Sequence, residues 1–336
     1  MKQWQLQAFG MDALALVDVD DPPPPGPGEV TVRFEAASLN YRDVLAIAGA
    51  YNPSQKFPLV PLSDGAGTVV AVGETVDTLA VGDRVAGIFA QTWLDGIPDS
   101  PPRHGSLGGA LPGVAQELRN FPATGLVRVP AHLDSLQAAT LPCAAVTAWH
   151  ALFERGAFHP GMTVLLQGSG GVSLFALQLA RAAGAEVIQL TSTDEKARTL
   201  RKLGAHHVIN YRTTPDWELA VRDCTGGRGV DQVIDVGGPE TLPKSVGCTR
   251  HGGRISMVGL LSGGQAALDL LPAIGRNIRF DAVFVGSRAM FQRLNRTLAI
   301  HSIEPVVDTV FAFDALPEAV EHLRAGRHVG KVALRY

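Results

Sequence analysis

The second half of the chain alternates short apolar runs with helical segments, and this pattern restricts the possible folds more than any other feature. Strands are predicted over 163–167, 186–190, 206–210, 231–235, 254–258 and 278–284, with helices over 172–183, 194–203, 215–223 and 240–246. Buried strands that alternate with helices form a parallel sheet that is covered on both faces. The pattern therefore predicts an α/β class and a doubly wound domain with a six-stranded parallel sheet.

A glycine-rich turn joins the first of these strands to its helix. It consists of Gly168, Ser169, Gly170, Gly171 and Val172, and Ser173 stands where a third, close-packing glycine is usual. Gly168 permits the tight turn, Gly170 lets the backbone approach a pyrophosphate, and the N–H groups at the helix start attract negative charge. Taken alone, such a turn is also compatible with a purely structural role. Within six alternating strands it predicts a dinucleotide site in a Rossmann domain.

The end of the second strand bears on which dinucleotide is bound. An Asp or Glu at this point binds the ribose 2′-hydroxyl of NADH and repels the 2′-phosphate of NADPH, and here no carboxylate occupies it. The polar residues near this point are Ser192, Thr193, Lys196, Tyr211 and Arg212. They predict NADPH, with NADH the less favoured cofactor. Two alternatives stay open: Ser192 and Glu195 form a capping box, or Asp194 contacts a ribose.

Length and composition restrict the class of protein and its partners. The chain has 336 residues, enough for about two domains. A formal net charge of -3 gives no general attraction to nucleic acid or to anionic lipid. No apolar stretch approaches the ~20 residues of a membrane helix, and the first residues show no secretory pattern. With three widely spaced cysteines, which fit a reducing compartment, we expect a cytoplasmic protein with no nucleic-acid or membrane partner.

The first part of the chain has the pattern of β structure. Short β-branched or apolar runs over 30–34, 67–72 and 84–89 are bounded by Gly, Pro and Asp. Residues 93–117 are rich in Gly and Pro and show little periodicity. We expect a long surface loop there.

Several segments, spread over nearly the whole chain, resemble the medium-chain dehydrogenase/reductase superfamily, in particular its zinc-independent quinone-oxidoreductase-like members. They are residues 38–43, 64–67, 81–85, 141–148, the Gly168 turn and Gly330-Lys331. The resemblance implies a GroES-like β domain built from residues 1–122 and 287–336, and a Rossmann domain over 123–286. It also implies a homodimer that pairs through the edge strand at 278–284.

Zinc alcohol dehydrogenases of this superfamily hold their catalytic metal with Cys, His and Cys. The resemblance places Asn40, Ser63 and Cys143 at these positions, and only the cysteine is a usual zinc ligand. Residues 93–117, where a second, structural zinc would be held, contain no cysteine. His206 and His207 adjoin at a predicted buried strand, and the other eight histidines are scattered without paired spacing. We therefore expect no zinc and no other metal.

The resemblance also implies where substrate and nicotinamide are held. Asn40 can donate a hydrogen bond to a developing oxyanion, Tyr41 or Tyr51 can donate or relay a proton, and Asp43 can orient its neighbours. Each residue also has a structural interpretation, since Asn and Asp favour turns and Asp43 can cap a helix through Ala48. The predicted catalytic set is Asn40, Tyr41, Asp43, Tyr51, Ser63 and Asp64. The predicted cofactor set is Thr147, Gly168, Ser169, Gly170, Gly171, Val172, Ser192, Thr193, Lys196, Tyr211, Gly237, Val258, Val285, Gly286 and Lys331.

Together these features predict an NADPH-dependent oxidoreductase that transfers hydride to a small-molecule substrate. The expected substrates are quinones, enones or related activated carbonyl compounds, reduced without zinc. A zinc-free alcohol or aldehyde dehydrogenase and a non-catalytic NADPH-binding protein are the alternatives. The sequence shows no tight acid/base pair, and it does not identify the physiological substrate.

Overall fold

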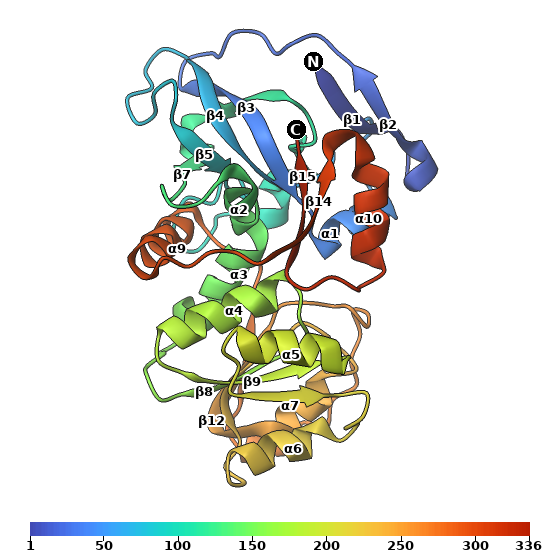
Figure 1. Ribbon diagram of the computed structural model, residues 1–336, viewed down its shortest axis with the longest axis vertical. Coiled ribbons are helices and arrows are strands. Elements are labelled where there is room, and N and C mark those ends of the chain that lie inside the picture. The colour runs from blue at the N-terminus through green and yellow to red at the C-terminus, as the bar shows by residue number, and fades with distance from the viewer. The chain divides into compact units, whose positions relative to one another are not determined.

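The computed structural model describes all 336 residues, which form two compact units. The first unit comprises Met1–Val146 and Val285–Tyr336, and the second comprises Thr147–Phe284 (Figure 1). Residues 123–146, which were expected in the Rossmann domain, lie in the first unit.

The second unit contains a six-stranded sheet in which every neighbouring pair of strands is parallel. The strand order is β10-β9-β8-β11-β12-β13, and the reversal of order between β8 and β11 is that of a doubly wound fold. Its strands are β8 (Thr163–Leu166), β9 (Glu186–Thr191), β10 (His207–Asn210), β11 (Val230–Asp235), β12 (Thr249–Met257) and β13 (Arg279–Ala282). The predicted α/β class and the six-stranded parallel sheet are confirmed.

Helices connect these strands and cover the sheet. They are α4 (Gly171–Ala182), α5 (Asp194–Lys202), α6 (Trp217–Cys224), α7 (Leu242–Cys248) and the short α8 (Leu271–Gly275). Because parallel crossovers are right-handed, α4 and α5 cover one face, while α6 and α7 pack together on the other (Figure 1). Central residues such as Leu165, Val233 and Ile255 are fully buried between these layers. None of the helices has the length and apolar character needed to cross a membrane.

The first unit is built around a seven-stranded sheet to which both ends of the chain contribute. Its path is β14-β15-β3-β4-β5-β7, with β6 paired to β3, and β1 and β2 form a separate antiparallel ribbon. The C-terminal β15 lies antiparallel to β3, which joins residues from opposite ends of the sequence. The strands are β1 (Lys2–Leu6), β2 (Leu14–Asp18), β3 (Glu29–Ser38), β4 (Asp64–Val72), β5 (Arg84–Gly87), β6 (Leu118–Pro122), β7 (Leu126–Arg128), β14 (Val307–Ala312) and β15 (Lys331–Arg335).

The helices of this unit are short, apart from one near the C-terminal end of the chain. The longest is α9 (Arg288–His301), whose N-cap Ser287 accepts a hydrogen bond from the N–H of Met290. The others are α1 (Tyr41–Ile47), α2 (Ser135–Ala139) and α10 (Leu316–Arg324), with 3-10 turns at Met11–Ala13, Pro102–Gly105, Ala123–Gly125 and Phe313–Ala315. A π-helical segment, Leu141–Ala145, precedes α3 (Val146–Trp149), where the chain enters the second unit, and a second π-helical segment, His150–Glu154, follows there.

The expectation of a surface loop over 93–117 is wrong for much of that segment. Leu107, Val114 and Ala115 are fully buried. The N–H of Gly113 donates to the carbonyl of Val60 at 2.7 Å, and the N–H of Val114 donates to Leu62 at 3.0 Å. Glycine is required here by close backbone approach, because a Cβ at Gly113 would lie 2.1 Å from two carbonyl oxygens.

Candidate active site and cofactor site

The glycine-rich turn lies between β8 and α4, as predicted. Gly168 has a φ of 75°, in the left-handed region that favours glycine, and Gly170 is the N-cap of α4. The side chain of Gln189 donates a hydrogen bond to the carbonyl of Gly168 at 2.8 Å, which fixes the turn. A Cβ at Gly168 or Gly170 would meet no other atom within 4 Å. The turn therefore has open space beside the start of a helix, where a pyrophosphate is favoured.

Ser173 explains why a serine can stand at the usual third glycine position. Its side chain is buried, and its hydroxyl donates to the carbonyl of Gln167 at 2.5 Å. This bond ties the first turn of α4 to the end of β8. The buried hydroxyl of Ser173 and the carbonyl of Gln167 thus satisfy each other's hydrogen bonding.

Two other predicted cofactor residues lie at the carboxyl ends of strands near the turn. Gly237 follows β11, and its N–H contacts Asp235 Oδ1 at 3.1 Å and Gln167 Oε1 at 3.3 Å. Val258 follows β12, and its N–H donates to the carbonyl of Asp235 at 2.9 Å. The sheet thus brings these residues to the same edge as Gly168, which is where doubly wound folds bind dinucleotides.

The residues predicted to surround the ribose are also brought together. Thr193 is the N-cap of α5, and its hydroxyl accepts a hydrogen bond from the N–H of Lys196 at 3.2 Å. The capping residue is therefore Thr193, and the alternative of a capping box that begins at Ser192 is wrong. The N–H of Tyr211 donates to the carbonyl of Thr191 at 3.0 Å, which places Tyr211 beside the end of β9. Ser192 and Lys196 are half-buried, and Tyr211 is exposed.

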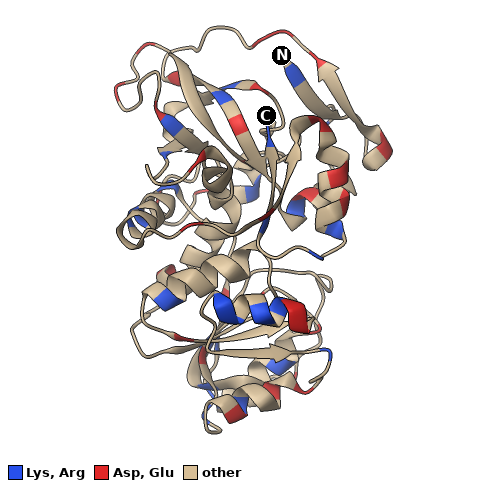
Figure 2. Cartoon of the chain, in the orientation of Figure 1, with Lys and Arg blue, Asp and Glu red and all other residues tan.

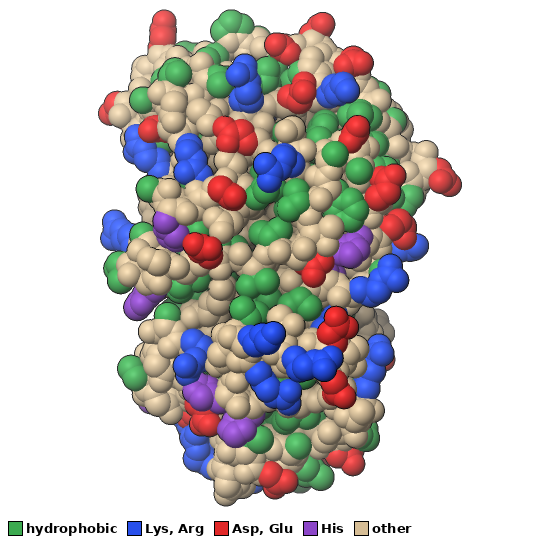
Figure 3. Space-filling model, viewed as in Figure 1, with side chains coloured by type: hydrophobic (Ala, Val, Ile, Leu, Met, Phe, Trp, Pro, Cys, Tyr) green, Lys and Arg blue, Asp and Glu red, His purple; other side chains and the backbone are tan.

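Helix α5 has acidic residues in its first turn and basic residues in its last turn. Asp194 and Glu195 lie in its first turn and Arg201 and Lys202 in its last, as the helix dipole favours (Figure 2). In the space-filling view, basic side chains gather over this helix (Figure 3). Asp194 accepts a hydrogen bond from the side chain of Asn210 at 2.9 Å, so this carboxylate already has a partner on β10.

In the first unit, the start of α1 holds a buried polar cluster. The ammonium of Lys331 donates to Asn40 Oδ1 at 2.5 Å and to the carbonyl of Leu39 at 2.7 Å. Lys331 is only 3% exposed, so its charge is removed from water. An ammonium group can only donate, and Asn40 must therefore turn its oxygen toward Lys331 and its NH₂ group away. This NH₂ group lies 3.5 Å from the hydroxyl of Ser63.

Asp64 lies next to this pair and is fully buried. One carboxylate oxygen accepts from the hydroxyl of Ser63 at 2.6 Å, and the other accepts from the N–H of Cys143 at 3.0 Å. Burial raises the pKa of Asp64, while the charge of Lys331 and the hydrogen bonds from Ser63 and Asn40 oppose that shift. The structure thus joins Asn40, Ser63, Asp64 and Lys331 into one network.

Asp43 belongs to the neighbouring turn of α1. Its carboxylate accepts from the N–H of Asn40 at 2.7 Å and pairs with Arg42 at 3.0 Å. The structural interpretation of Asp43 as a helix cap is confirmed, because Asp43 is the N3 residue of a capping box on α1, in which Asn40 is the N-cap and Ala48 the C-cap. Asp43 thus holds Asn40 at the N-cap, and its part in the active site stays a prediction.

The two tyrosines have different surroundings. Tyr41 is 41% exposed on α1. Tyr51 stacks with the guanidinium of Arg42, which lies 4.3 Å from the ring centre. Burial raises the pKa of Tyr51, although the Arg42 charge opposes this shift, so the phenol stays protonated near neutral pH. No role is predicted for Arg42 from the sequence, because one arginine among many gives no signal that it is buried.

The remaining predicted cofactor residues lie where the chain changes unit. Val285 has a φ of 42°, which is unusual for a β-branched residue. A Cβ at Gly286 would lie 2.7 Å from the Val146 side chain, so this position has no room for a larger residue. Thr147 is buried in α3.

The donor set around Asn40 fits a catalytic zinc poorly. Asn40 and Ser63 supply neutral oxygen atoms, and the ammonium of Lys331 places a positive charge against the first of them. Removal from water and the nearby Asp64 carboxylate raise the pKa of the Cys143 thiol, which keeps it protonated, whereas zinc binds the thiolate. No group of three or more His, Cys, Asp or Glu side chains is placed to hold a metal ion.

Comparison with known proteins assigns the chain to a family. Residues 26–131 match the alcohol dehydrogenase GroES-like domain, and residues 171–299 match the zinc-binding dehydrogenase family. A zinc-type alcohol dehydrogenase-like protein of Schizosaccharomyces pombe is 44% identical over 97% of this chain and 96% of its own length. The chain belongs to the medium-chain dehydrogenase/reductase superfamily, as its sequence motifs predicted.

Two further relatives are informative. The crystal structure of a putative alcohol dehydrogenase from Sinorhizobium meliloti has a TM-score of 0.94 and 38% identity, and the match covers 100% of this chain and 98% of the other. A 2-haloacrylate reductase of a Burkholderia species is 38% identical over 70% of this chain and 66% of its own length. The protein is an oxidoreductase with a GroES-like domain and an NAD(P)-dependent Rossmann fold.

Proposed function

We propose that this protein uses NADPH to reduce quinones, enones or related small activated carbonyl compounds, without zinc. The observation that carries the proposal is the buried contact between Lys331 and Asn40. It presents the Asn40 NH₂ group as a fixed donor where relatives of the superfamily hold a metal. When bound, the cofactor supplies a hydride.

The substrate class follows from how much charge the donors must stabilise. Asn40 and a tyrosine hydroxyl are neutral donors, and the one hydroxyl proton of Ser63 is donated to Asp64, whereas a zinc ion acts as a strong Lewis acid on an alkoxide. Hydride addition to a conjugated C=C bond or a quinone spreads the negative charge into an enolate or quinol oxygen, which neutral hydrogen bonds can accommodate. The likeness to a 2-haloacrylate reductase supports reduction of an activated alkene. Tyr51, protonated near neutral pH, is the proposed source of the proton.

The preference for NADPH rests on the residues at the end of β9. Hydroxyl and ammonium groups are present there on Ser192, Thr193 and Lys196. The position where a carboxylate would bind the ribose 2′-hydroxyl of NADH holds no Asp or Glu. Tyr211 lies beside the same strand end. A charged hydrogen bond to the 2′-phosphate contributes about 1.5 to 3 kcal/mol, or roughly tenfold or more in affinity.

The decisive experiment titrates the purified protein with NADPH and NADH and then supplies a panel of quinones, enones and aldehydes. NADPH should bind at least about tenfold more tightly than NADH, and Lys196→Ala should remove most of this difference. Equal binding of the two cofactors, or no effect of the substitution, would refute the NADPH assignment. Turnover of simple alcohols or aldehydes above enones and quinones would favour the dehydrogenase alternative, and binding without turnover would favour a non-catalytic role.

Metal analysis tests the zinc-free part of the proposal separately. We expect no stoichiometric zinc in the purified protein, and activity that survives a chelator. One zinc per chain, with activity lost on chelation and restored by zinc, would overturn both this assignment and the reaction class.

We further propose that the protein acts in the cytoplasm as a homodimer. The three free cysteines favour a reducing compartment. Strand β13 is one edge of the six-stranded sheet, and an edge strand can pair with its copy across a two-fold axis. Exposed apolar side chains precede this strand at Leu270, Leu271 and Ile274.

A further inference from the structure

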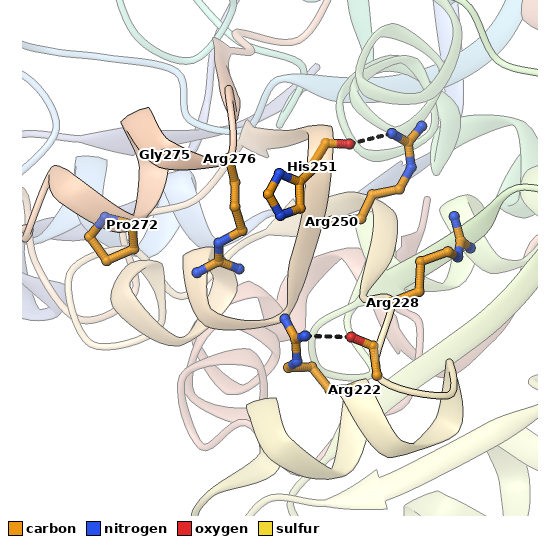
Figure 4. A pocket seen from close by; sticks show the side chains of 8 residues that line it. Arg222, Arg228, Arg250, His251, Pro272, Gly275 and Arg276 are labelled. Atoms are coloured by element: carbon orange, nitrogen blue, oxygen red, sulfur yellow. Dashed lines mark hydrogen bonds between the residues drawn. The ribbon is translucent and has the colours of Figure 1, made fainter.

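An open pocket of about 680 Å³ in the Rossmann unit is lined mainly by basic side chains. Four arginines and a histidine contribute to it: Arg222, Arg228, Arg250, His251 and Arg276. In the close view, the side chains of Arg222, His251 and Arg276 converge on the same space, while Arg228 and Arg250 lie to one side (Figure 4).

The pocket and the glycine-rich turn lie at opposite ends of the strands. Gly168 follows the carboxyl end of β8. In contrast, Arg228 lies two residues before β11, Arg250 is the second residue of β12, and Arg276 lies three residues before β13. Since all six strands are parallel, these residues gather at the amino ends of the strands. A ligand in this pocket would therefore leave the dinucleotide site free.

The lining carries more positive charge than its neighbours neutralise. Arg228 and Arg250 both pair with the single carboxylate of Asp231, which leaves one excess positive charge. Arg222 bonds only to the main-chain carbonyl of Gly227, and Arg276 bonds to the carbonyls of Gly247 and Thr249. These carbonyls lie at the ends of α6 and α7, so the arginines satisfy helix C-termini, but carbonyl dipoles do not cancel a full charge.

We propose that this pocket binds a small ligand that carries two or more adjoining phosphate groups. Arginine guanidinium groups match the geometry of phosphate oxygens and can bind them with two parallel hydrogen bonds. Arg222 and Arg276 are half-buried, which weakens screening by solvent. The volume of the pocket falls within the range of small-molecule sites, about 300 to 1,000 Å³.

The surroundings favour a small polyanion over an extended nucleic acid. Helix α6, which provides Arg222, also carries Glu218 and Asp223, and Asp216 precedes it. Lys244 pairs with both Asp216 and Glu218, so this group of four side chains keeps a net negative charge, which would repel a polyanion that continued beyond the pocket. The basic groups are thus concentrated in a concave site and do not form a stripe along which a phosphate backbone could run.

Calorimetric titration of the full chain with inorganic tripolyphosphate at low ionic strength tests the proposal. A saturating nicotinamide cofactor fills the glycine-rich turn during the titration. We expect one saturable site per chain, and at least about tenfold weaker binding after Arg222→Gln with Arg276→Gln, because two charge-assisted contacts are lost. Glutamine retains an N–H donor for the helix-end carbonyls, so this variant should stay folded.

Two control variants distinguish an effect of the pocket's positive charge from an effect on folding or on overall charge. Arg222→Lys with Arg276→Lys keeps both charges and should retain most of the affinity. Arg296→Gln with Arg327→Gln removes the same net charge from exposed positions in the other unit and should bind like the wild type. Equal binding by the wild type and the Arg222→Gln, Arg276→Gln variant would overturn the site, as would an absence of saturable binding. A single-stranded oligonucleotide that binds with the same arginine dependence, where tripolyphosphate does not, would replace it with a nucleic-acid site.

Discussion

Lys331 shows how one buried side chain organises several neighbours. Its ammonium binds Asn40 and the carbonyl of Leu39, and its charge opposes the upward pKa shift that burial imposes on Asp64. A buried cation is tolerated only with such partners. The sequence motif Gly330-Lys331 predicted a cofactor contact for this lysine, and that contact stays a prediction, since the structure shows only its polar partners in the protein.

Lys331→Met should therefore change both stability and its dependence on pH. Without the ammonium, the pKa of Asp64 rises further, because burial then acts with less opposition. A carboxyl whose folded-state pKa is raised contributes stability at low pH that is lost as pH rises through that pKa. Urea unfolding of the variant should thus show stability that falls as pH rises from acid toward neutral, more steeply than in the wild type.

Adding Asp64→Asn to Lys331→Met provides the control, because the amide cannot ionise. The double variant should lose the additional pH dependence, although Asn40 and Leu39 remain without their donor. The explanation fails if the double and single variants show the same slope. In the enzyme assay, Lys331→Met should lower kcat about tenfold or more by releasing the Asn40 amide.

Asp231 gives the opposite dependence on pH. Burial would raise its pKa, but hydrogen bonds from Arg228, the Thr163 N–H and Arg250 outweigh burial and lower it to about 2. A lowered carboxyl pKa contributes stability above the unfolded value of about 3.9, and this stability is lost as pH falls toward the folded value. Asp231→Asn should cost about 1 to 2 kcal/mol at neutral pH, after allowance for solvent screening, and much less near pH 2 to 3. Equal losses at both pH values, measured by denaturant unfolding, would contradict this account.

At the scale of secondary structure, the sequence predicted elements best where periodicity and turns agree. The strands β8 to β13 and the helices α4 to α7 lie within a few residues of their predicted positions, except that β12 begins earlier. Strands β8 and β9 are mainly apolar, buried runs, and Gly168 marks the turn that follows β8. The network of Asn40, Ser63 and Asp64 was predicted only as a set of neighbouring segments, because hydrogen bonds between distant turns leave no periodic signal.

The segment 93–117 shows the limit of composition as a guide. Its many glycines are typical of exposed loops, yet Gly108 and Gly113 are buried against the backbone of Leu62 and Pro61. The sequence does not distinguish a glycine needed for flexibility from one needed for close contact. That distinction depends on a partner segment more than forty residues away in the chain.

Gly113→Ala tests this interpretation of the buried segment. The added Cβ would lie 2.1 Å from the carbonyl oxygens of Leu62 and Pro61, so the backbone must move apart. We expect a loss of about 1 to 3 kcal/mol in the free energy of unfolding, which is typical of an overpacked interior. Gly264→Ala is the matched control, because a Cβ there meets no atom within 4 Å and its φ is not positive. Similar stabilities for the two variants would show that the segment is loosely packed.

At the scale of the whole molecule, the six-stranded sheet ends in two edges, β10 and β13. An unpaired edge strand presents main-chain N–H and C=O groups that can pair with another chain. Proteins usually cover such a strand or protect it with charged residues, proline or a bulge. The residues just before β13 are unusually apolar for a surface, since Leu270, Leu271 and Ile274 are 58%, 74% and 69% exposed. A cluster of exposed leucine and isoleucine beside a free strand edge is typical of an interface.

Leu271→Asp with Ile274→Asp should therefore convert a dimer into a monomer. Two buried carboxylates per subunit would face their copies or apolar surface across the two-fold axis, and both the lost apolar burial and the desolvation of charge oppose association. Light scattering at micromolar concentration should give twice the chain mass for the wild type and the chain mass for the variant, with unchanged circular dichroism. Ile97→Asp with Ile300→Asp adds the same charge at the similarly exposed positions of the other unit, 94% and 77%, and should remain dimeric. A monomeric wild type would refute the homodimer, whereas dimers that survive Leu271→Asp with Ile274→Asp would move the interface away from the β13 edge.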